Sequence, residues 1–260
     1  MSRGQLFWGG MLILLGGLML AGQMGFELPN GNSLMSLFFP VALIGSGIWV
    51  LLSVFIRREV TSESASIQLQ GASEASLKIN HGAGEFRLHS GASADEFMRG
   101  TFTGGLEHKA ERSGDRLQVR MRPAGDFFMP SFGRSEGLNW DVSLNASIPT
   151  ALDMNMGANK SVINLQDMNI TALKLNSGAS DTTITLPAQG RLNVTCEVGA
   201  ASLTLIVPEG VAIRTHATMG AGDFHVDKSR FPASESPDFA SAPNAVDIRV
   251  TGGAASVRVR

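Results

Sequence analysis

The residues with the greatest capacity for chemistry are five histidines, and their spacing does not bring them into one site. They are His81, His89, His108, His216 and His225. None forms the HxxxH or HExxH pair that turns two imidazoles toward one metal ion. His225 also occupies the place that Arg87 has in a matching segment, which is typical of a solvent-facing position. We therefore expect no metal site.

Two carboxylates in matching segments raise the question of acid–base catalysis. Glu85 and Asp223 each follow a GAG triplet, and the same match places Phe86 and Phe224 at equivalent core positions. Paired carboxylates can cleave glycosidic bonds when they lie close together. We expect these two to lie several rungs of a repeating structure apart, and carboxylates beside turns commonly bond to nearby backbone. The prediction is that neither is catalytic.

The Gly-Ala triplets do not predict a phosphate or cofactor site. They lack the GxGxxG and GxxxxGKS/T spacings, and no helical pattern follows them. The one cysteine, Cys196, lies in the alternating run LNVTCEV, which favours a small buried residue over a reactive thiol. A formal net charge of -2 gives no electrostatic reason to expect nucleic acid as a partner. We expect no cofactor and no enzymatic activity.

A cluster of apolar side chains on an expected loop is the strongest candidate for a contact surface. The segment DFFMPSFG lies between RPAG and GRSEG, which are typical of loops. Its large apolar residues are Phe127, Phe128, Met129 and Phe132. Such side chains on a loop suit a partner interface or a membrane surface. The alternative is a cap over an open end of the β-structure that hides edge strands, and we favour the cap.

The elements that must position these residues are of two kinds, and the first is a pair of apolar segments. Residues 6–24 and 34–56 contain no charge, and each is close to the roughly 20 residues that a helix needs to cross the hydrocarbon core. We predict a two-helix transmembrane hairpin over residues 1–58. A cleaved signal peptide is the alternative for the first segment, but only Arg3 precedes it and no A-x-A-like site follows it.

Charges beside these segments predict the orientation of the hairpin. The turn between the spans carries Glu27 and no basic residue, whereas Arg57 and Arg58 follow the second span. Basic residues favour the cytoplasmic side of a membrane. Trp8 and Trp49 lie near span ends, where indoles prefer the interface. We predict a plasma-membrane protein with two spans and a cytoplasmic C-terminal domain.

The rest of the chain has the pattern of strands. After a polar linker over residues 59–66, apolar and polar residues alternate, as in SLKIN and RLQVRM. No segment beyond residue 60 has a sustained helical stripe. We predict an all-β domain over residues 67–260.

A Gly-Ala corner repeats at a fixed interval in this domain. Gly157, Gly178, Gly199 and Gly220 begin triplets 21 residues apart, and Gly253 begins another after 33. Such self-similarity marks stacked units, so the expected fold is a stacked-strand β-solenoid. Glycine permits positive φ at a corner, and a small following residue leaves room for the next corner to stack. Whether residues 223–252 form a rung or a loop stays open.

The two regions together resemble one bacterial family. The hairpin resembles the membrane region of LiaF-like proteins of cell-envelope stress systems through RGQLFWGGMLILLGGLMLAG and FFPVALIGSGIWVLL. The remainder resembles the β-solenoid called toastrack in those proteins through WDVSLNASIPTALDMNMGANKSVINLQDMNITALKLNSGASDTTITLP and VGAASLTLIVPEG. The insertion around Phe127 and the Pro- and Ser-rich loop before Val246 depart from the resemblance. The resemblance implies a membrane-anchored regulator that restrains a sensor histidine kinase, and no kinase contact maps onto a particular residue.

Three functions fit this organisation. The first is a non-enzymatic signalling regulator, in which the hairpin holds the solenoid beside a kinase. The second is a scaffold built as a homo-oligomer, in which solenoids stack end to end and which needs exposed terminal strands. The third is an outward-facing glycan-binding protein, which the loop charges disfavour. The resemblance favours the regulator.

Overall fold

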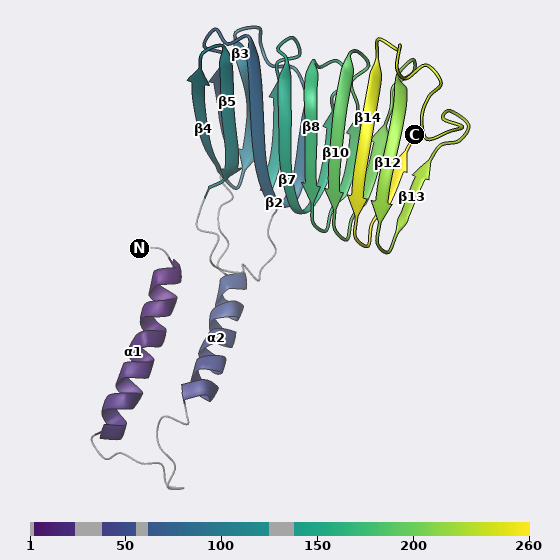
Figure 1. Cartoon of the computed structure of the whole chain (residues 1–260). Helices are drawn as coiled ribbons and strands as arrows, with labels where there is room; N and C mark the ends of the chain where they lie inside the picture. The colour runs from purple at the N-terminus through teal and green to yellow at the C-terminus, as the bar shows by residue number, and fades with distance from the viewer. Residues whose placement is uncertain (1–2, 24–37, 56–61, 125–137) are drawn as a thin grey trace. The chain divides into compact units, whose positions relative to one another are not determined.

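The computed structural model describes residues 3–23, 38–55, 62–124 and 138–260 (Figure 1). The described residues form two compact units, of which one contains two helices and the other contains fifteen strands. The predicted apolar loop cluster of Phe127, Phe128, Met129 and Phe132 lies outside the described residues, as do Arg57 and Arg58.

Two apolar helices, α1 (Arg3–Gln23) and α2 (Phe38–Phe55), occupy most of the two segments predicted to be spans. Their apolar side chains include strongly exposed ones such as Phe39. Over the residues whose side chains are described, no helix is both long enough and apolar enough to cross a membrane. The helices lie where the sequence predicts them, and the membrane spans stay a prediction. The side chains of Trp8 and Trp49 lie outside the described residues.

The second unit consists of strands and turns, which confirms a mostly β domain. The strands are β1 (Ser62–Gln68), β2 (Glu74–Ser90), β3 (Glu96–Thr103), β4 (Leu106–Ser113), β5 (Arg116–Pro123), β6 (Leu138–Leu144), β7 (Thr150–Asn164), β8 (Ile170–Ser177), β9 (Asp181–Thr185), β10 (Arg191–Val198), β11 (Ser202–Ile206), β12 (Ala212–Met219), β13 (Asp223–Val226), β14 (Ala245–Gly252) and β15 (Ser256–Val259). Strand β1 includes residues 62–66 of the expected linker, because its serine-rich sequence is too polar to stand out as a strand.

Each rung consists of two strand segments that meet at a Gly-Ala corner. The corner lies inside the long strands β2 and β7, and it separates β8 from β9, β10 from β11, β12 from β13 and β14 from β15. The rungs stack into two walls through parallel ladders. The first wall contains, in order, β4, β5, β2, β7, β8, β10, β14 and β12 (Figure 1). The second contains β1, β3, β6, the later halves of β2 and β7, then β9, β11, β15 and β13.

The core lies between the walls and is filled by rows of side chains that run across the rungs. One such row contains Val119, Leu77, Leu152, Leu173, Val194 and Ile248, all of them buried. Burial of one such side chain is worth roughly 1.5–3 kcal/mol relative to exposure. The rows that link successive rungs are therefore the main source of the domain's stability. Phe86 and Phe224 lie in one further row, as predicted, and Phe224 is only partly buried because its rung is terminal.

The corner glycines lie close to neighbouring corners, most tightly at Gly157 and Gly199, and they do not provide positive φ. They are Gly157, Gly178, Gly199, Gly220 and Gly253, and none of them has a positive φ. The prediction of positive φ at these positions is therefore wrong. A Cβ added to Gly157 would lie 2.5 Å from the carbonyl oxygen of Gly82, and one added to Gly199 would lie 2.9 Å from that of Gly178. Hydrogen bonds between corners, such as Gly178 N–H to the Met156 carbonyl at 2.9 Å, hold them this close.

The last rung in the sequence is not the last rung in the stack. Strand β14 pairs in parallel with both β10 and β12, and β15 pairs with both β11 and β13. The final rung therefore lies between the two rungs that precede it in the chain. The segment 223–252 contains both a rung and a loop, because β13 completes the terminal rung, residues 227–244 form a connection, and β14 begins the inserted rung. We call residues 227–244 the strap.

The strap covers part of the edge of the terminal rung. It pairs with β12 at Arg214 and Glu235, and Thr215 N–H donates to the Ser234 carbonyl at 2.8 Å. The ring of Phe239 is buried, and its centre lies 4.2 Å from Cζ of Arg214 and 5.3 Å from Cζ of Arg191. Cations this close to an aromatic face are attracted to it. Part of the edge at this end of the stack is thus covered by a segment of the chain itself.

Candidate functional site

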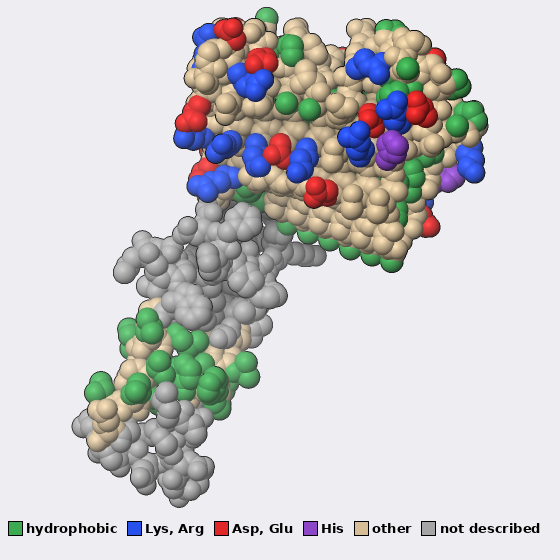
Figure 2. All heavy atoms as spheres, in the orientation of Figure 1, with side chains coloured by type: hydrophobic (Ala, Val, Ile, Leu, Met, Phe, Trp, Pro, Cys, Tyr) green, Lys and Arg blue, Asp and Glu red, His purple; other side chains and the backbone are tan. Residues whose placement is uncertain are grey.

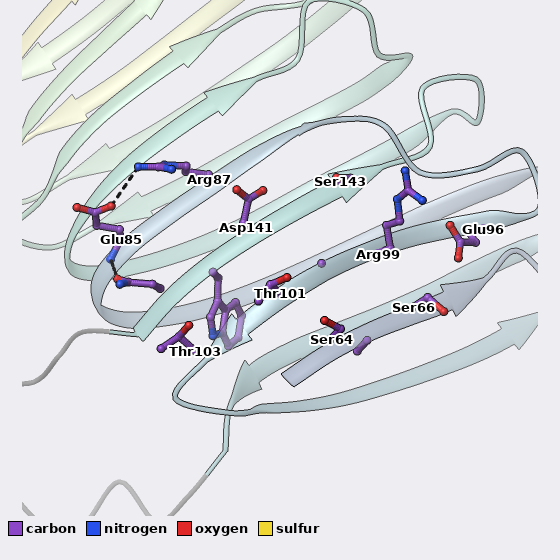
Figure 3. Close-up of a pocket in the computed structure, with 14 residues that line it drawn as sticks. Ser64, Ser66, Glu85, Arg87, Glu96, Arg99, Thr101, Thr103, Asp141 and Ser143 are labelled. Atoms are coloured by element: carbon purple, nitrogen blue, oxygen red, sulfur yellow. Dashed lines mark hydrogen bonds and ion pairs between the residues drawn. The ribbon is translucent and has the colours of Figure 1, made fainter. Parts of the chain in front are cut away.

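A polar hollow of about 730 Å³ lies on the outer surface of the second wall (Figure 3). It extends over β1, β3, β6 and the later half of β2. Its volume falls within the roughly 300–1,000 Å³ of typical ligand pockets, but its lining is more polar than theirs. The side chains that Figure 3 labels are Ser64, Ser66, Glu85, Arg87, Glu96, Arg99, Thr101, Thr103, Asp141 and Ser143.

The hollow forms because short side chains occupy its floor and longer ones its rim. One cross-strand row contains Ser64, Thr101, Asp141 and Arg87, and the next contains Ser66, Arg99, Ser143 and His89. Serine and threonine on β1 and β3 leave space between the long side chains at either end. Gly100 brings β3 close to β6, since a Cβ there would clash with the carbonyl oxygen of Asp141.

Two ion pairs hold the charged side chains at the β2–β6 side of the hollow. Arg87 Nη2 lies 3.4 Å from Glu85 Oε2, and His89 Nε2 lies 2.9 Å from Asp141 Oδ1. All four side chains are about half exposed, and pairs of this kind contribute little to stability in water. Their effect is to fix the positions of these charges and to pair the Glu85 and Asp141 carboxylates with cations.

The surroundings of His89 favour its charged form. Nδ1 lies 2.8 Å from the carbonyl oxygen of Ser90, and Nε2 faces the Asp141 carboxylate. Both partners are acceptors, so only the doubly protonated imidazolium can donate to both. The bond to the Ser90 carbonyl raises the pKa of His89 most, partial burial opposes it, and Asp141 adds to the rise.

The floor of the hollow offers groups that no described residue engages. The hydroxyls of Ser64, Ser66, Thr101 and Ser143 make no hydrogen bond to another described residue. Arg99 donates from Nη2 to the Gly91 carbonyl at 2.7 Å, and no carboxylate of the described residues lies within ion-pair distance of it. Glu96 likewise has no cation partner in the described part of the chain. These free donors and acceptors can bind a polar ligand.

A buried aromatic and polar cluster supports the floor. Trp140 borders the hollow and points into the core, with ring-centre distances of 5.3 Å to Phe102 and 5.2 Å to His81. His81 lies between Asn159 Nδ2, 3.0 Å from its Nδ1, and the Leu138 carbonyl, 3.1 Å from its Nε2. The neutral tautomer with the proton on Nε2 satisfies both contacts. Burial lowers the pKa of His81 to about 4, although the bond to Leu138 opposes this.

The carboxylates and histidines singled out in the sequence do not come together. Glu85 and Asp223 share a cross-strand row, but β7, β9, β11 and β15 lie between them. At about 4.8 Å per strand they are roughly 24 Å apart, too far to act on one glycosidic bond. Among the described residues, no group of three or more His, Cys, Asp or Glu side chains is placed to hold a metal ion. His225 lies in the row of Arg87 and is exposed, as predicted.

The structure also places the remaining predicted residues. Cys196 is buried, as predicted, and burial raises the pKa of its thiol to about 12. The corner glycines line the stack and not a site. The loop cluster around Phe127 lies outside the described residues, so its role as a cap or an interface stays a prediction.

Apart from Glu85 and Arg87, which the matching segments single out for other reasons, the residues of the hollow were not found by sequence reasoning. Ser64, Arg99, Thr101 and Asp141 come from three separate segments that carry no motif. Their meeting depends on β1 and β3, which join β6 in antiparallel fashion and lie outside the repeating rungs. The available signal is that a small hydroxyl residue occupies every second position in SESAS and TFT, which indicates a strand face with room above it.

Comparison with known proteins gives one family and one fold. A family model described as the N-terminal domain of toast_rack, DUF2154, matches residues 56–206. A comparison with curated proteins found no match.

Three solved structures illustrate the similarity in fold. A proposed cell adhesion protein from Clostridium sporogenes is 17% identical, with a TM-score of 0.70 over 77% of this chain and 99% of that chain. A proposed adhesin from Bacteroides fragilis is 8% identical, with a TM-score of 0.32 over 77% and 97%. A proposed lipid-binding protein from Parabacteroides distasonis is 11% identical, with a TM-score of 0.25 over 77% and 97%. The first shows a shared β-solenoid-like fold, and the other two are too dissimilar to add to it.

Proposed function

The chain belongs to the family of the N-terminal domain of toast_rack, and on that premise we propose that it is a membrane-anchored, non-enzymatic regulator that holds a protein partner at the polar hollow of its β domain. The observation that carries this proposal is the hollow itself, a surface of binding size. Among the described residues, the hydroxyls of its floor have no hydrogen-bond partner, and the charges of Arg99 and Glu96 have no ion-pair partner. Stacked rungs beneath it make a firm platform for such a contact.

The membrane anchor is the part of the proposal that rests on the helices. Both α1 and α2 are apolar and free of internal charge, and exposed apolar residues on them need a nonpolar environment. The excess of basic residues outside the turn between them favours a cytoplasmic β domain. The anchor is therefore proposed to lie in the bacterial plasma membrane with two spans.

The proposed partner is a sensor histidine kinase of the cell-envelope stress response. The support for this partner is the resemblance of both regions to LiaF-like proteins, in which the regulator restrains a kinase in unstressed cells. A surface that binds and releases a kinase needs hydrogen-bonding groups and no covalent chemistry. The hollow offers the former, with two of its carboxylates held in ion pairs.

The end-to-end scaffold is less well supported by the edges of the stack. Such a scaffold needs open strands at both ends. At one end the strap covers Ile213–Thr215 of β12, and at the other β4 presents Glu107, Lys109 and Glu111. Charged and covered edges work against stacking of one copy on another.

A reporter of the envelope-stress response tests the proposed function. A strain that lacks the protein is complemented with the wild type or with one of two variants. Thr101→Arg fills the hollow with a long side chain. Thr183→Arg is the control, because it places the same side chain on β9 of the same wall. We expect the response to be switched on without stress in the deletion and with Thr101→Arg, and to stay off with Thr183→Arg. An unchanged reporter in the deletion strain would overturn kinase control.

A further inference from the structure

The four outer edges of the two walls differ in how they are protected. An unprotected edge strand presents free N–H and C=O groups to which another chain can pair. Strand β4 carries charged residues, and Figure 2 shows basic and acidic side chains together at this edge of the β domain. Strand β12 is partly covered by the strap, and β13 has only four residues. Each of these is a recognised way of preventing edge-to-edge pairing. Three of the four edges are thus protected.

Strand β1 is the edge without such protection. It has seven residues, SESASIQ, with no lysine, arginine or proline. Its single charged side chain, Glu63, accepts a hydrogen bond from Leu106 N–H and so does not guard the edge. Among the described strands, β1 pairs with β3 alone. On its other side, no strand of the described residues pairs with it.

The two faces of β1 define the chemistry of a strand that would pair with it. Toward the core, Ala65 is partly buried and Ile67 is buried, so alternate residues of an added strand would be apolar. Toward solvent, Ser64 and Ser66 lead into the hollow, so the intervening residues would be polar. The edge thus fits an amphipathic strand.

Charge at this edge adds a further requirement. Glu63 lies at the start of β1, and the Leu69 N–H bond to the Asp95 carbonyl brings Asp95 and Glu96 to its end. None of these three carboxylates has an ion-pair partner among the described residues. Arg99, one strand further in, reaches away from β1 to the Gly91 carbonyl. Arg112 of β4 donates to the Gln70 carbonyl just beyond β1, so one cation lies near that end of the edge. Among the described residues, the three carboxylates outnumber this guanidinium, and the mainly acidic edge complements basic side chains.

We propose that an extended basic segment of the partner protein adds to the free edge of β1 as a further strand. Its main chain pairs with β1, its apolar residues extend the core beyond Ala65, and its basic residues lie beside Glu96 on the hollow side. The inference rests on the proposed function, because it names the part of the protein partner that binds there. Strand addition of this kind takes affinity from main-chain hydrogen bonds and specificity from alternate side chains.

The test is peptide binding to the full chain in detergent micelles, followed by fluorescence anisotropy. The probe is a short labelled peptide in which valine alternates with threonine or arginine. A second peptide has glutamate in place of arginine, and a third has N-methylated backbone amides that cannot pair. Two variants of the chain are tested, each with a matched control. Glu96→Gln is compared with Glu197→Gln. Ala65→Lys is compared with Ala110→Lys, because Ala110 is a partly buried alanine on β4.

We expect the arginine peptide to bind, and the glutamate peptide to bind more than about tenfold more weakly, a difference of about 1.4 kcal/mol. Glu96→Gln should weaken binding about threefold to fivefold, as expected for an exposed ion pair. Ala65→Lys should abolish binding because it places a charge on the core side of the edge. Glu197→Gln and Ala110→Lys should bind like the wild type.

Several results would overturn the inference. The first is that the N-methylated peptide binds as tightly as the unmodified arginine peptide, and the second is that Ala110→Lys weakens binding as much as Ala65→Lys does. The third is that no peptide binds at about 1 mM. The fourth is that two copies of the chain pair through β1 in the absence of peptide. If Ala65→Lys does not fold, the binding measured with Glu96→Gln and with the N-methylated peptide still tests the inference. Peptide binding with an unchanged stress reporter would sustain the edge site and reject the kinase as its partner.

Discussion

At the scale of single residues, the corner glycines show how one rung constrains the next. Each first glycine of a triplet lies against the carbonyl oxygen of the neighbouring corner, and the available space differs from corner to corner. The distance from an added Cβ to that oxygen is 2.5 Å at Gly157, 2.9 Å at Gly199 and 3.4 Å at Gly220. A real Cβ does not approach an oxygen to 2.5 Å, so the backbone there would have to move.

Alanine at these three glycines should therefore lower stability in a graded order. We expect Gly157→Ala to cost about 2–3 kcal/mol through overpacking. Gly199→Ala should cost less, and Gly220→Ala should be close to neutral because alanine also lowers the entropy of the unfolded chain. Thermal melts of the full chain, followed by circular dichroism, measure the order. Equal losses at all three would contradict the stacking explanation.

His81 should make the fold less stable in acid. Its pKa is lowered to about 4 in the folded chain, compared with about 6.5 when unfolded. Between these values the unfolded chain takes up a proton that the folded chain does not, so stability falls as the pH drops from about 6.5 to about 4. His81→Asn should flatten this part of the stability–pH curve. An unaltered slope would show that other groups cause the acid loss.

His89 should act in the opposite direction. Its pKa is raised in the folded chain, so its contribution is fully present below about pH 6.5 and is lost as the pH rises through the folded value. We expect His89→Gln to destabilise the chain at about pH 6 and to match the wild type at about pH 9. A direct check is the titration of the His89 ring signal by NMR. A midpoint below about 6.5 would refute the assignment of an imidazolium bound to Ser90 and Asp141.

At the scale of elements, the strap closes the terminal rung through one aromatic side chain. Phe239 packs with Ala212, Ala242 and Ala245 and lies between two arginines. We expect Phe239→Ala to lower stability by about 3 kcal/mol and to cause association that rises with concentration, because the edge of β12 becomes free. Light scattering and thermal melts measure both effects. Lys228→Ala, an exposed change in the same strap, serves as the control and should leave both unchanged.

The repeating rungs could be predicted from the sequence, whereas the ends of the stack could not. The 21-residue period from Gly157 to Gly220 follows from geometry that each rung shares with the next. The antiparallel strands β1, β3 and β4 have no repeat to reveal them, and the insertion of β14 between β10 and β12 leaves no local trace. The hollow lies at such an end, so its residues on β1, β3 and β6 were missed for the same reason. The corner glycines were predicted correctly, but positive φ is not the reason for them. The distance between neighbouring corners, which is the reason, cannot be read from the sequence of one rung.

At the scale of the whole molecule, the two units suggest a division of labour. The apolar helices suit an anchor, and the described strands of the β domain present a firm wall with a polar hollow and, beside it, an edge that no described strand pairs with. Protection of the other edges favours contact with a partner at a single place over stacking of many copies. Such a protein would act by binding a partner and keeping it near the anchor. In the proposed function, the side of the membrane on which the β domain lies decides which partners it can reach.

The most direct test of the central claim is the labelling of Thr251→Cys with a membrane-impermeant maleimide. Thr251 is exposed on β14, and the wild type serves as the negative control because its Cys196 is buried with a pKa raised to about 12. Intact cells, with any outer membrane permeabilised, are compared with lysed cells. The account predicts labelling only after lysis, which would place the β domain in the cytoplasm beside the kinase. Labelling of intact cells would contradict it and would direct the search to partners on the cell surface.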